Sequence, residues 1–373
     1  MNMKSIPVNT PLISESDIEA VVASLREGWI SGDGPIVAKF EADFAQFCSR
    51  KHGISVTNGT AAIELVIHAL NFGPNDEIIV PSFAIISCIS QILRCGATPV
   101  FVDSDPITWN MDTSKLEESI TAKTKAILVV HTYGLPVEMD TVLKIAQKHG
   151  LIVIEDAAES HGLTYNGKRC GSFGLVSTFS FYANKNITTG EGGIIVTDDD
   201  LLNERLRYFR NLTFQEEHRF VHNDLGWNLR MSSVQCALGS SQLSRINEIT
   251  EHRRRVGSYY HSAFAQIDDI QIPFVGDKSA FNDYWVFGIV LNGRRLNNRS
   301  LIQNTLSELG IGTRPFFWPL HLQPVLKQFG LTSNIELKVS EHIGQNGFYI
   351  PNGLGMKQLD IEYVAEQVQK VLK

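Results

Sequence analysis

The chain has 373 residues, and its 33 basic and 40 acidic residues leave a formal net charge of −7. A chain of this length can bury a large core, usually as one large domain and a smaller one. Because the balance is mildly acidic and the basic residues are spread along the chain, we expect no nucleic-acid partner and no polybasic membrane contact. The one basic cluster, Arg253-Arg254-Arg255, lies in a helical stretch, and we interpret it as a solvated helix face.

The five cysteines are scattered and odd in number, without a C-x-x-C pair, which indicates neither a disulfide framework nor a zinc site. The first residues lack the apolar stretch of a signal peptide, and no run of about 18 apolar residues occurs. We therefore expect a cytoplasmic protein without a membrane partner.

The first predicted element is a helix that begins near Ser16, with Glu19 as the second member of a capping box, and ends at Gly28. From about residue 50 to 210, short apolar runs alternate with helical patterns. The predicted strands are 77–80, 99–103, 126–130 and 151–154. Continuous hydrophobicity indicates strands buried on both faces, and hence a mostly parallel sheet. The alternation predicts an α/β fold with this sheet between helices.

The pattern changes after about residue 245. A long polar helix is predicted over 243–264, followed by a strand-like run at 284–291 and by helical segments that bracket a turn at 314–315. We place a domain boundary there. The prediction is a large domain of residues 1–245 and a smaller C-terminal α/β domain of residues 246–373.

Lys185 lies between an apolar stretch and a glycine-rich turn at 190–193. A lysine in dry surroundings loses its proton more easily and becomes an amine nucleophile. Asp156 ends an apolar run that is typical of a buried strand. An amine nucleophile and an aspartate at a strand end are what a pyridoxal-phosphate site needs. Most lysines are solvated, however, and an aspartate there commonly caps the next helix.

The segment Asn58-Gly59-Thr60 opens a predicted helix. Exposed N–H groups at a helix start suit a phosphate, although Asn58 could equally be an ordinary cap. The small side chain of Ala158 would let a flat ring lie over the strand end. We interpret His131 as a structural group, and no residue spacing indicates a metal site.

Taken in chain order, these motifs resemble the DegT/DnrJ-type nucleotide-sugar aminotransferases, which are fold-type I pyridoxal-phosphate enzymes. The resemblance covers nearly the whole chain. It rests on residues 58–60, 76–81, 155–159, 171–174, 179–181, 185, 190–193 and 228–231.

The resemblance implies that Lys185 binds the aldehyde of pyridoxal 5'-phosphate and then shuttles a proton. Asp156 would pair with the pyridine nitrogen, and Glu159 would lie near the ring hydroxyl. Asn228 would reach the phosphate of the neighbouring subunit's cofactor, which implies a homodimer with shared active sites. The other expected cofactor-binding residues are Gly59, Thr60, Ala158 and Ser180.

One position departs from the family pattern. The aromatic residue that usually stacks on the cofactor ring is matched here by Ile85, with Phe83 two residues earlier. Either Ile85 packs on the ring as an aliphatic group, or Phe83 takes over through a shifted loop.

Within the family, residues 188–192, 218–220 and 314–321 resemble the members that form GDP-perosamine. This implies transfer of an amino group from L-glutamate to C4 of GDP-4-keto-6-deoxymannose, for surface polysaccharide such as O-antigen. Arginines would supply charge for the nucleotide diphosphate, and aromatic rings a stacking surface. The expected substrate-binding residues are His218, Arg219, Arg230, Arg314, Phe317, Trp318 and His321.

Several alternatives stay open. The acceptor could be a dTDP- or UDP-linked 4-keto sugar. The enzyme could be a pyridoxal-phosphate-dependent sugar dehydratase, although such relatives replace the lysine with histidine. The chain could also be a regulator that kept the fold and lost turnover. The 314–321 segment could be a structural turn that closes the smaller domain.

Overall fold

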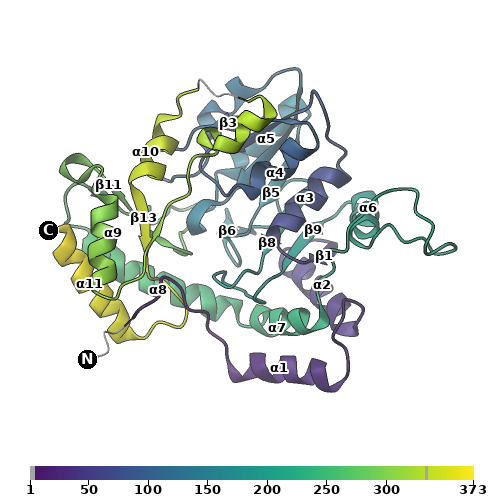
Figure 1. Cartoon of the computed structure of the whole chain (residues 1–373), viewed down its shortest axis with the longest axis horizontal. Coiled ribbons are helices and arrows are strands. Elements are labelled where there is room, and N and C mark those ends of the chain that lie inside the picture. The colour runs from purple at the N-terminus through teal and green to yellow at the C-terminus, as the bar shows by residue number, and fades with distance from the viewer. Residues whose placement is uncertain (1–4, 332–334) are drawn as a thin grey trace.

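The computed structural model describes residues 5–331 and 335–373. Its centre is a seven-stranded sheet in the order β1-β9-β8-β5-β4-β2-β3, in which β9 alone runs against its neighbours (Figure 1). The predicted mostly parallel sheet is therefore confirmed. The strands are β1 His52–Val56, β2 Glu77–Pro81, β3 Thr98–Val102, β4 Thr124–Val130, β5 Ile152–Asp156, β8 Val176–Ser180 and β9 Gly193–Thr197.

Helices cover both faces of this sheet, as the sequence of β4 requires. Ala126, Leu128 and Val130 pack against α3 and α4 on one face, while Ile127 and Val129 pack with α5 on the other. Alternate residues of a strand point to opposite faces, so an unbroken apolar strand needs a cover on each side. The helices of this layer are α2 Pro35–Phe47, α3 Gly59–Ala69, α4 Ser87–Arg94, α5 Met139–His149, α6 Asp200–Arg210 and α7 Ser233–Leu243.

A second, four-stranded sheet has the order β10-β11-β13-β12 and lies with its helices at the left of Figure 1. Its core includes Val256, Tyr260 and Phe287. The predicted boundary at residue 245 falls in the link between α7 and α8, and it stays a prediction. The elements are α8 Ile246–Phe264, β10 Ile270–Gln271, β11 Phe287–Leu291, α9 Arg299–Glu308, β12 Arg314–Pro315, α10 Lys338–Asn346, β13 Gly347–Ile350 and α11 Gln358–Leu372; a separate small hairpin holds β6 Thr164–Tyr165 and β7 Lys168–Arg169.

Several predicted element boundaries were wrong. The first helix is α1, Glu15–Arg26, and its capping box joins Ser14 to Asp17 rather than Ser16 to Glu19. The helix predicted over 243–264 is instead α7 followed by α8. Strand β11 begins at Phe287 rather than at residue 284.

Two predictions about side chains and turns also need correction. The pair Arg314-Pro315 forms a short strand with β13 instead of a turn, because Arg314 and Pro315 pair with Tyr349 and Phe348. Of the basic cluster, Arg254 and Arg255 are exposed, but Arg253 is only 1% exposed. Among the described helices, none is both long and apolar enough to cross a membrane.

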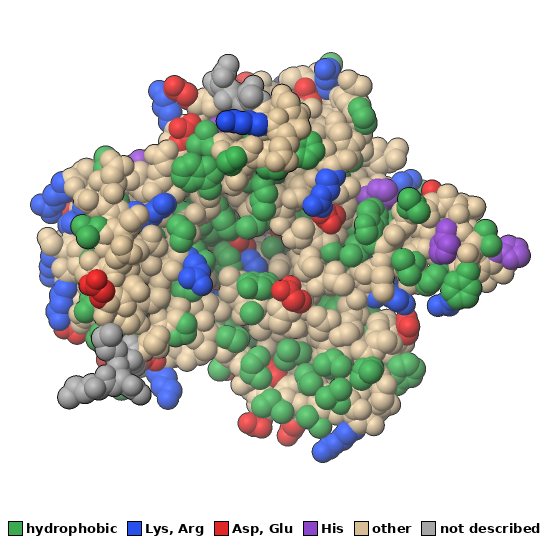
Figure 2. Space-filling model, viewed as in Figure 1, with side chains coloured by type: hydrophobic (Ala, Val, Ile, Leu, Met, Phe, Trp, Pro, Cys, Tyr) green, Lys and Arg blue, Asp and Glu red, His purple; other side chains and the backbone are tan. Residues whose placement is uncertain are grey.

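The face shown in Figure 2 is hollowed near its centre, between the two sheets with their helices. At the right of the same view, residues 211–228 form an arm that stands out from the body after α6 (Figures 1 and 2). The arm exposes Phe220, Val221 and Leu225.

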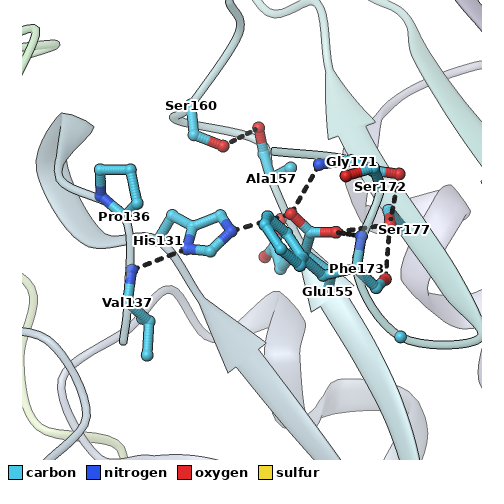
Figure 3. Close-up of polar contacts among 12 residues, drawn as sticks. His131, Pro136, Val137, Glu155, Ala157, Ser160, Gly171, Ser172, Phe173 and Ser177 are labelled. Atoms are coloured by element: carbon cyan, nitrogen blue, oxygen red, sulfur yellow. Dashed lines mark hydrogen bonds and ion pairs between the residues drawn. The ribbon is translucent and has the colours of Figure 1, made fainter. Parts of the chain in front are cut away.

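A buried polar cluster fixes the ends of β4 and β5. The Glu155 carboxylate accepts hydrogen bonds from His131 Nε2, the Gly171 and Phe173 amides and the Ser177 hydroxyl, at 2.6–3.0 Å (Figure 3). The Val137 amide donates to His131 Nδ1 at 3.0 Å, so the ring proton lies on Nε2. Cys170 lies near enough to suggest a metal set with His131 and Glu155, but these hydrogen bonds already occupy the histidine and carboxylate atoms. The cluster therefore has a structural role, as we expect of His131.

We predict that Glu155→Gln lowers the free energy of unfolding by about 3 kcal/mol, because the new amide group must face a buried donor. The measurement is urea denaturation of the apoproteins. Glu204→Gln, an exposed change on α6, is the control and should stay within about 0.5 kcal/mol of the parent. Equal stability of the two variants would contradict this interpretation.

Candidate active site

A cavity of about 650 Å³ opens at the C-terminal ends of β4 and β5 and at the start of α3. Ligands commonly bind at this edge of α/β sheets. Elements beyond residue 245 close it with Trp285, Phe317 and Tyr349. The cavity is lined by predicted site residues Gly59, Thr60, Ile85, Asp156, Ala158, Glu159, Ser180, Lys185 and Phe317.

Lys185 sits in a tight turn after β8. Phe179 and Phe181 anchor the end of this strand by packing edge-on against Phe44 of α2, with ring centroids 4.9 and 5.3 Å apart. The chain then turns back, and the Lys185 amide donates to the Tyr182 carbonyl at 2.9 Å. The turn carries the lysine side chain into the buried wall of the cavity, where the residue is 8% exposed.

The ammonium group of Lys185 lies 3.4 Å from Glu159 Oε1 and 3.7 Å from the centroid of the Trp285 ring. Burial lowers the pKa of Lys185, and the charges of Glu159 and Asp156 act in the opposite direction. The net shift is downward, so a larger share of the amine is free of its proton than for a solvated lysine. The site therefore holds an amine that is suited to act as a nucleophile.

Asp156 ends β5 and is 3% exposed. Its carboxylate accepts from the Ala158 amide at 3.1 Å and from the Cys88 thiol at 3.5 Å. Burial raises the pKa of Asp156, and these donors together with Lys185 offset part of the rise. A buried carboxylate with so few donors is suited to a cationic N–H group in the cavity.

The start of α3 provides a place for a phosphate. Asn58 caps the helix by accepting from the Ala61 amide at 2.8 Å, and the first-turn amides point out of the helix. A side chain at Gly59 would lie 2.7 Å from the Ser180 Cβ, so glycine keeps this approach open. Thr60 adds a hydroxyl, which lies 2.8 Å from the Ser87 hydroxyl.

These groups fit pyridoxal phosphate. A free amine for the aldehyde, a carboxylate for the pyridine nitrogen and a helix start for the phosphate all line one cavity. Ile85 lines the cavity and is 41% exposed, whereas Phe83 is fully buried among Tyr133, Phe316 and Phe317. The packing of Ile85 on the cofactor ring stays a prediction.

Other predicted residues lie outside the cavity of this chain. His218 and Arg219 are exposed on the arm, and Asn228 at its base accepts from Arg230 Nε at 3.0 Å. Arg314 and Trp318 are exposed.

His321 is buried rather than open to a substrate. Its Nδ1 lies 2.6 Å from the Ser82 hydroxyl, and its Nε2 lies 3.2 Å from Glu341. These contacts join the 320–322 turn to β2 and α10, so the structure gives the residue a packing role.

The sequence analysis missed Asn184, Trp285 and Tyr349, all of which line the cavity. Asn184 adjoins the lysine and could have been included on that ground. Trp285 and Tyr349 come from the second sheet region, and only the tertiary fold brings them to Lys185.

A model of the DegT/DnrJ/EryC1/StrS aminotransferase family matches residues 11–369. The chain is 38% identical over 372 residues to the GDP-perosamine synthase of Caulobacter vibrioides, covering 100% of this chain and 99% of that protein. It is 35% identical over 368 residues to the GDP-perosamine synthase of Escherichia coli O157:H7, covering 99% of each. The chain belongs to the DegT/DnrJ/EryC1/StrS aminotransferase family.

Solved structures agree with this assignment. Helicobacter pylori PseC, an aminotransferase involved in the biosynthesis of pseudoaminic acid, has a TM-score of 0.93 at 26% identity, covering 99% of each chain. Spr1654 from Streptococcus pneumoniae, solved in its PLP form, has a TM-score of 0.91 at 26% identity, covering 99% of this chain and 98% of that one. The chain is thus a sugar aminotransferase of the fold-type I class, and pyridoxal phosphate is its cofactor.

We predict that Gly59→Ala weakens pyridoxal phosphate binding about tenfold, because the added methyl group crowds Ser180 where the phosphate must fit. The measurement is a titration of the apoenzyme by visible absorption. Gly73→Ala is the control, since its new methyl group would lie 4.0 Å from the Cys95 carbonyl. An unchanged dissociation constant for Gly59→Ala would contradict the phosphate assignment.

Proposed function

We propose that the enzyme transfers the amino group of L-glutamate to C4 of GDP-4-keto-6-deoxymannose and so forms GDP-perosamine for surface polysaccharide such as O-antigen. The observation that carries the proposal is full-length similarity to GDP-perosamine synthases, in a chain whose cavity holds Lys185 and Asp156 together. The five free cysteines suit a cytoplasmic location, which is part of the proposal.

Bound pyridoxal phosphate supplies an electron sink for the carbon that loses or gains a proton. In our proposal Lys185 would hold the cofactor through its aldehyde, and its Nζ would take and return the proton of the donor carbon. Asp156 would pair with the ring nitrogen. Glu159 keeps the amine in place through its contact at 3.4 Å. Gly59, Thr60 and Ser180 would hold the phosphate.

Water must be kept from this chemistry. Trp285 and Tyr349 line the cavity beside Lys185, and Phe317 completes the wall. We assign these rings the exclusion of water. Phe317 is also the predicted substrate residue that reaches this chain's own cavity.

The arm supports the proposal of a homodimer with shared sites. Within the arm, the Phe214 ring centroid lies 5.9 Å from that of Phe220 and 4.7 Å from Cζ of the Arg219 guanidinium. Nevertheless Phe220 stays 79% exposed, and Leu225 is 90% exposed. Apolar groups this exposed commonly mark a protein interface. In a dimer, Asn228, His218 and Arg219 would reach the cavity of the second copy.

A second apolar surface supports self-association. Ile18 and Leu25 of α1 are about half exposed, and Trp29 and Ile30 follow the helix with exposed side chains. Hydrophobic side chains gather over α1 at the bottom of Figure 2. Burial of this surface in a dimer would remove it from water.

The substrate is tested by incubating the enzyme with L-glutamate and each of the GDP-, dTDP- and UDP-linked 4-keto-6-deoxy sugars, with products identified by mass spectrometry. We expect the aminated GDP sugar as the main product. Lys185→Ala should lose at least about a thousandfold in rate, because the nucleophile is gone. Lys168→Ala, an exposed lysine, should be unaffected. Preference for a dTDP- or UDP-linked sugar would contradict the proposed substrate, and a deoxygenated product would indicate a dehydratase.

Shared sites are tested by mixing two variants, Lys185→Ala and Asn228→Ala, under conditions that exchange subunits. Each variant alone should be nearly inactive. An equal mixture should regain about a quarter of the parental activity, because half of the dimers are mixed and each of these has one intact site. Activity that stays absent in the mixture, or full activity of Asn228→Ala alone, would contradict the shared site.

A further inference from the structure

Arg253 is a buried cation beside the lysine turn, in the middle of a helix whose next two arginines are exposed. It shares the inward face of α8 with Ile249, Val256 and Tyr260. Burying a guanidinium is costly unless its donors are satisfied. The partners it meets therefore indicate what the residue does.

Its donors reach both sides of Lys185. Arg253 Nη2 donates to the Asn184 carbonyl at 3.1 Å, and Nε donates to the side-chain oxygen of Asn186 at 3.0 Å. The Asn184 carbonyl belongs to the peptide that joins Asn184 to Lys185. Fixing this peptide and the next side chain fixes the direction in which the lysine leaves the backbone.

The third nitrogen reaches the second sheet. Arg253 Nη1 donates to the Trp285 carbonyl at 2.9 Å and also to the Asn352 carbonyl. Trp285 precedes β11, and Asn352 follows β13. The Trp285 side chain also contacts the turn that carries Lys185, because its indole N–H donates to the same Asn184 carbonyl at 2.9 Å.

All of these acceptors are carbonyl or amide oxygens, and no ion pair of Arg253 with a carboxylate occurs in the described part of the chain. The Asn186 side-chain amide in turn donates to the Asp283 carboxylate at 2.6 Å, so Asn186 links the guanidinium to this carboxylate. A planar guanidinium with several fixed donors can hold such a set, whereas a lysine cannot reach all of it.

We propose that Arg253 is a positioning residue for Lys185, which holds the Asn184 carbonyl before the lysine and the Asn186 side chain after it and ties both to the second sheet. The inference rests on the proposed function in one respect, namely that Lys185 carries the cofactor. Arg253 acts through its neighbours and need not touch the cofactor.

The experiment compares cofactor-loaded wild type with Arg253→Met, Arg253→Lys and the matched control Arg254→Met. The first readout is the rate at which the visible band of bound pyridoxal phosphate disappears on dilution. The second is the midpoint of the pH titration of that band, without any substrate. Thermal unfolding of the apoproteins reports the structural effect separately.

Arg253→Met should lose the cofactor at least about tenfold faster, because the lysine turn loses its donors. Its titration midpoint should move upward, since a positive charge that opposes protonation of Lys185 is gone. Arg253→Lys should also lose the cofactor faster but keep the wild-type midpoint, because its charge remains. Arg254→Met should match wild type within about twofold. The other titratable groups near Lys185 or lining its cavity are unchanged in these variants; they are Asp156, Glu159, His161, Tyr182, Tyr349, Glu64 and Glu191.

A wild-type rate and midpoint in Arg253→Met would overturn the inference, as would a lower unfolding temperature with both readouts unchanged. If Arg253→Met does not fold, Arg253→Lys decides, because it keeps the charge and loses the fork of donors. Wild-type cofactor loss in Arg253→Lys would again overturn the inference. A wild-type protein that gains no visible band with pyridoxal phosphate would overturn the proposed function and the inference together.

Discussion

Burial of the Lys185 amine beside two carboxylates is the constraint on which the rest of the structure depends. Loss of hydration lowers the pKa of the lysine and raises those of Asp156 and Glu159, so burial acts against the charged form of all three groups. The arrangement is stable only if each group keeps its few partners. The Tyr133 amide, which donates to Glu159 at 2.8 Å, is one of them. Shifts in these directions suit a site whose groups must exchange protons.

The sheet supplies this arrangement through strand periodicity. Glu155 and Asp156 are neighbours on β5, so their side chains point to opposite faces. Glu155 points into the polar cluster that joins β4, β5, β8 and the loop before β8, whereas Asp156 points into the cavity. One acid of the pair therefore holds the strand end in place, and the other faces the cavity, where we propose that it pairs with the cofactor. The second sheet then closes the cavity and, through Arg253, holds the lysine turn.

Local patterns were sufficient to predict the mostly parallel sheet and to single out Lys185 and Asp156, and they offered the cap at Asn58 as one of two interpretations. Contacts between distant segments were not predictable in this way. The sequence predicts His321 as a substrate-binding residue, yet its side chain is buried against Ser82 and Glu341. The burial of Arg253, in contrast, could have been predicted from the sequence. Helical spacing places residue 253 on the face of the buried apolar residues Ile249, Val256 and Tyr260.

The most direct test of the account is to locate the residue that binds the cofactor. The protein would be loaded with pyridoxal phosphate, treated with borohydride to fix the link between aldehyde and amine, digested, and mapped by mass spectrometry. We predict that the label lies on Lys185 and disappears in Lys185→Ala, while Lys168→Ala, at an exposed position, keeps it. A label on another lysine, or bound cofactor without any label, would contradict the central claim that the buried amine of Lys185 is the nucleophile.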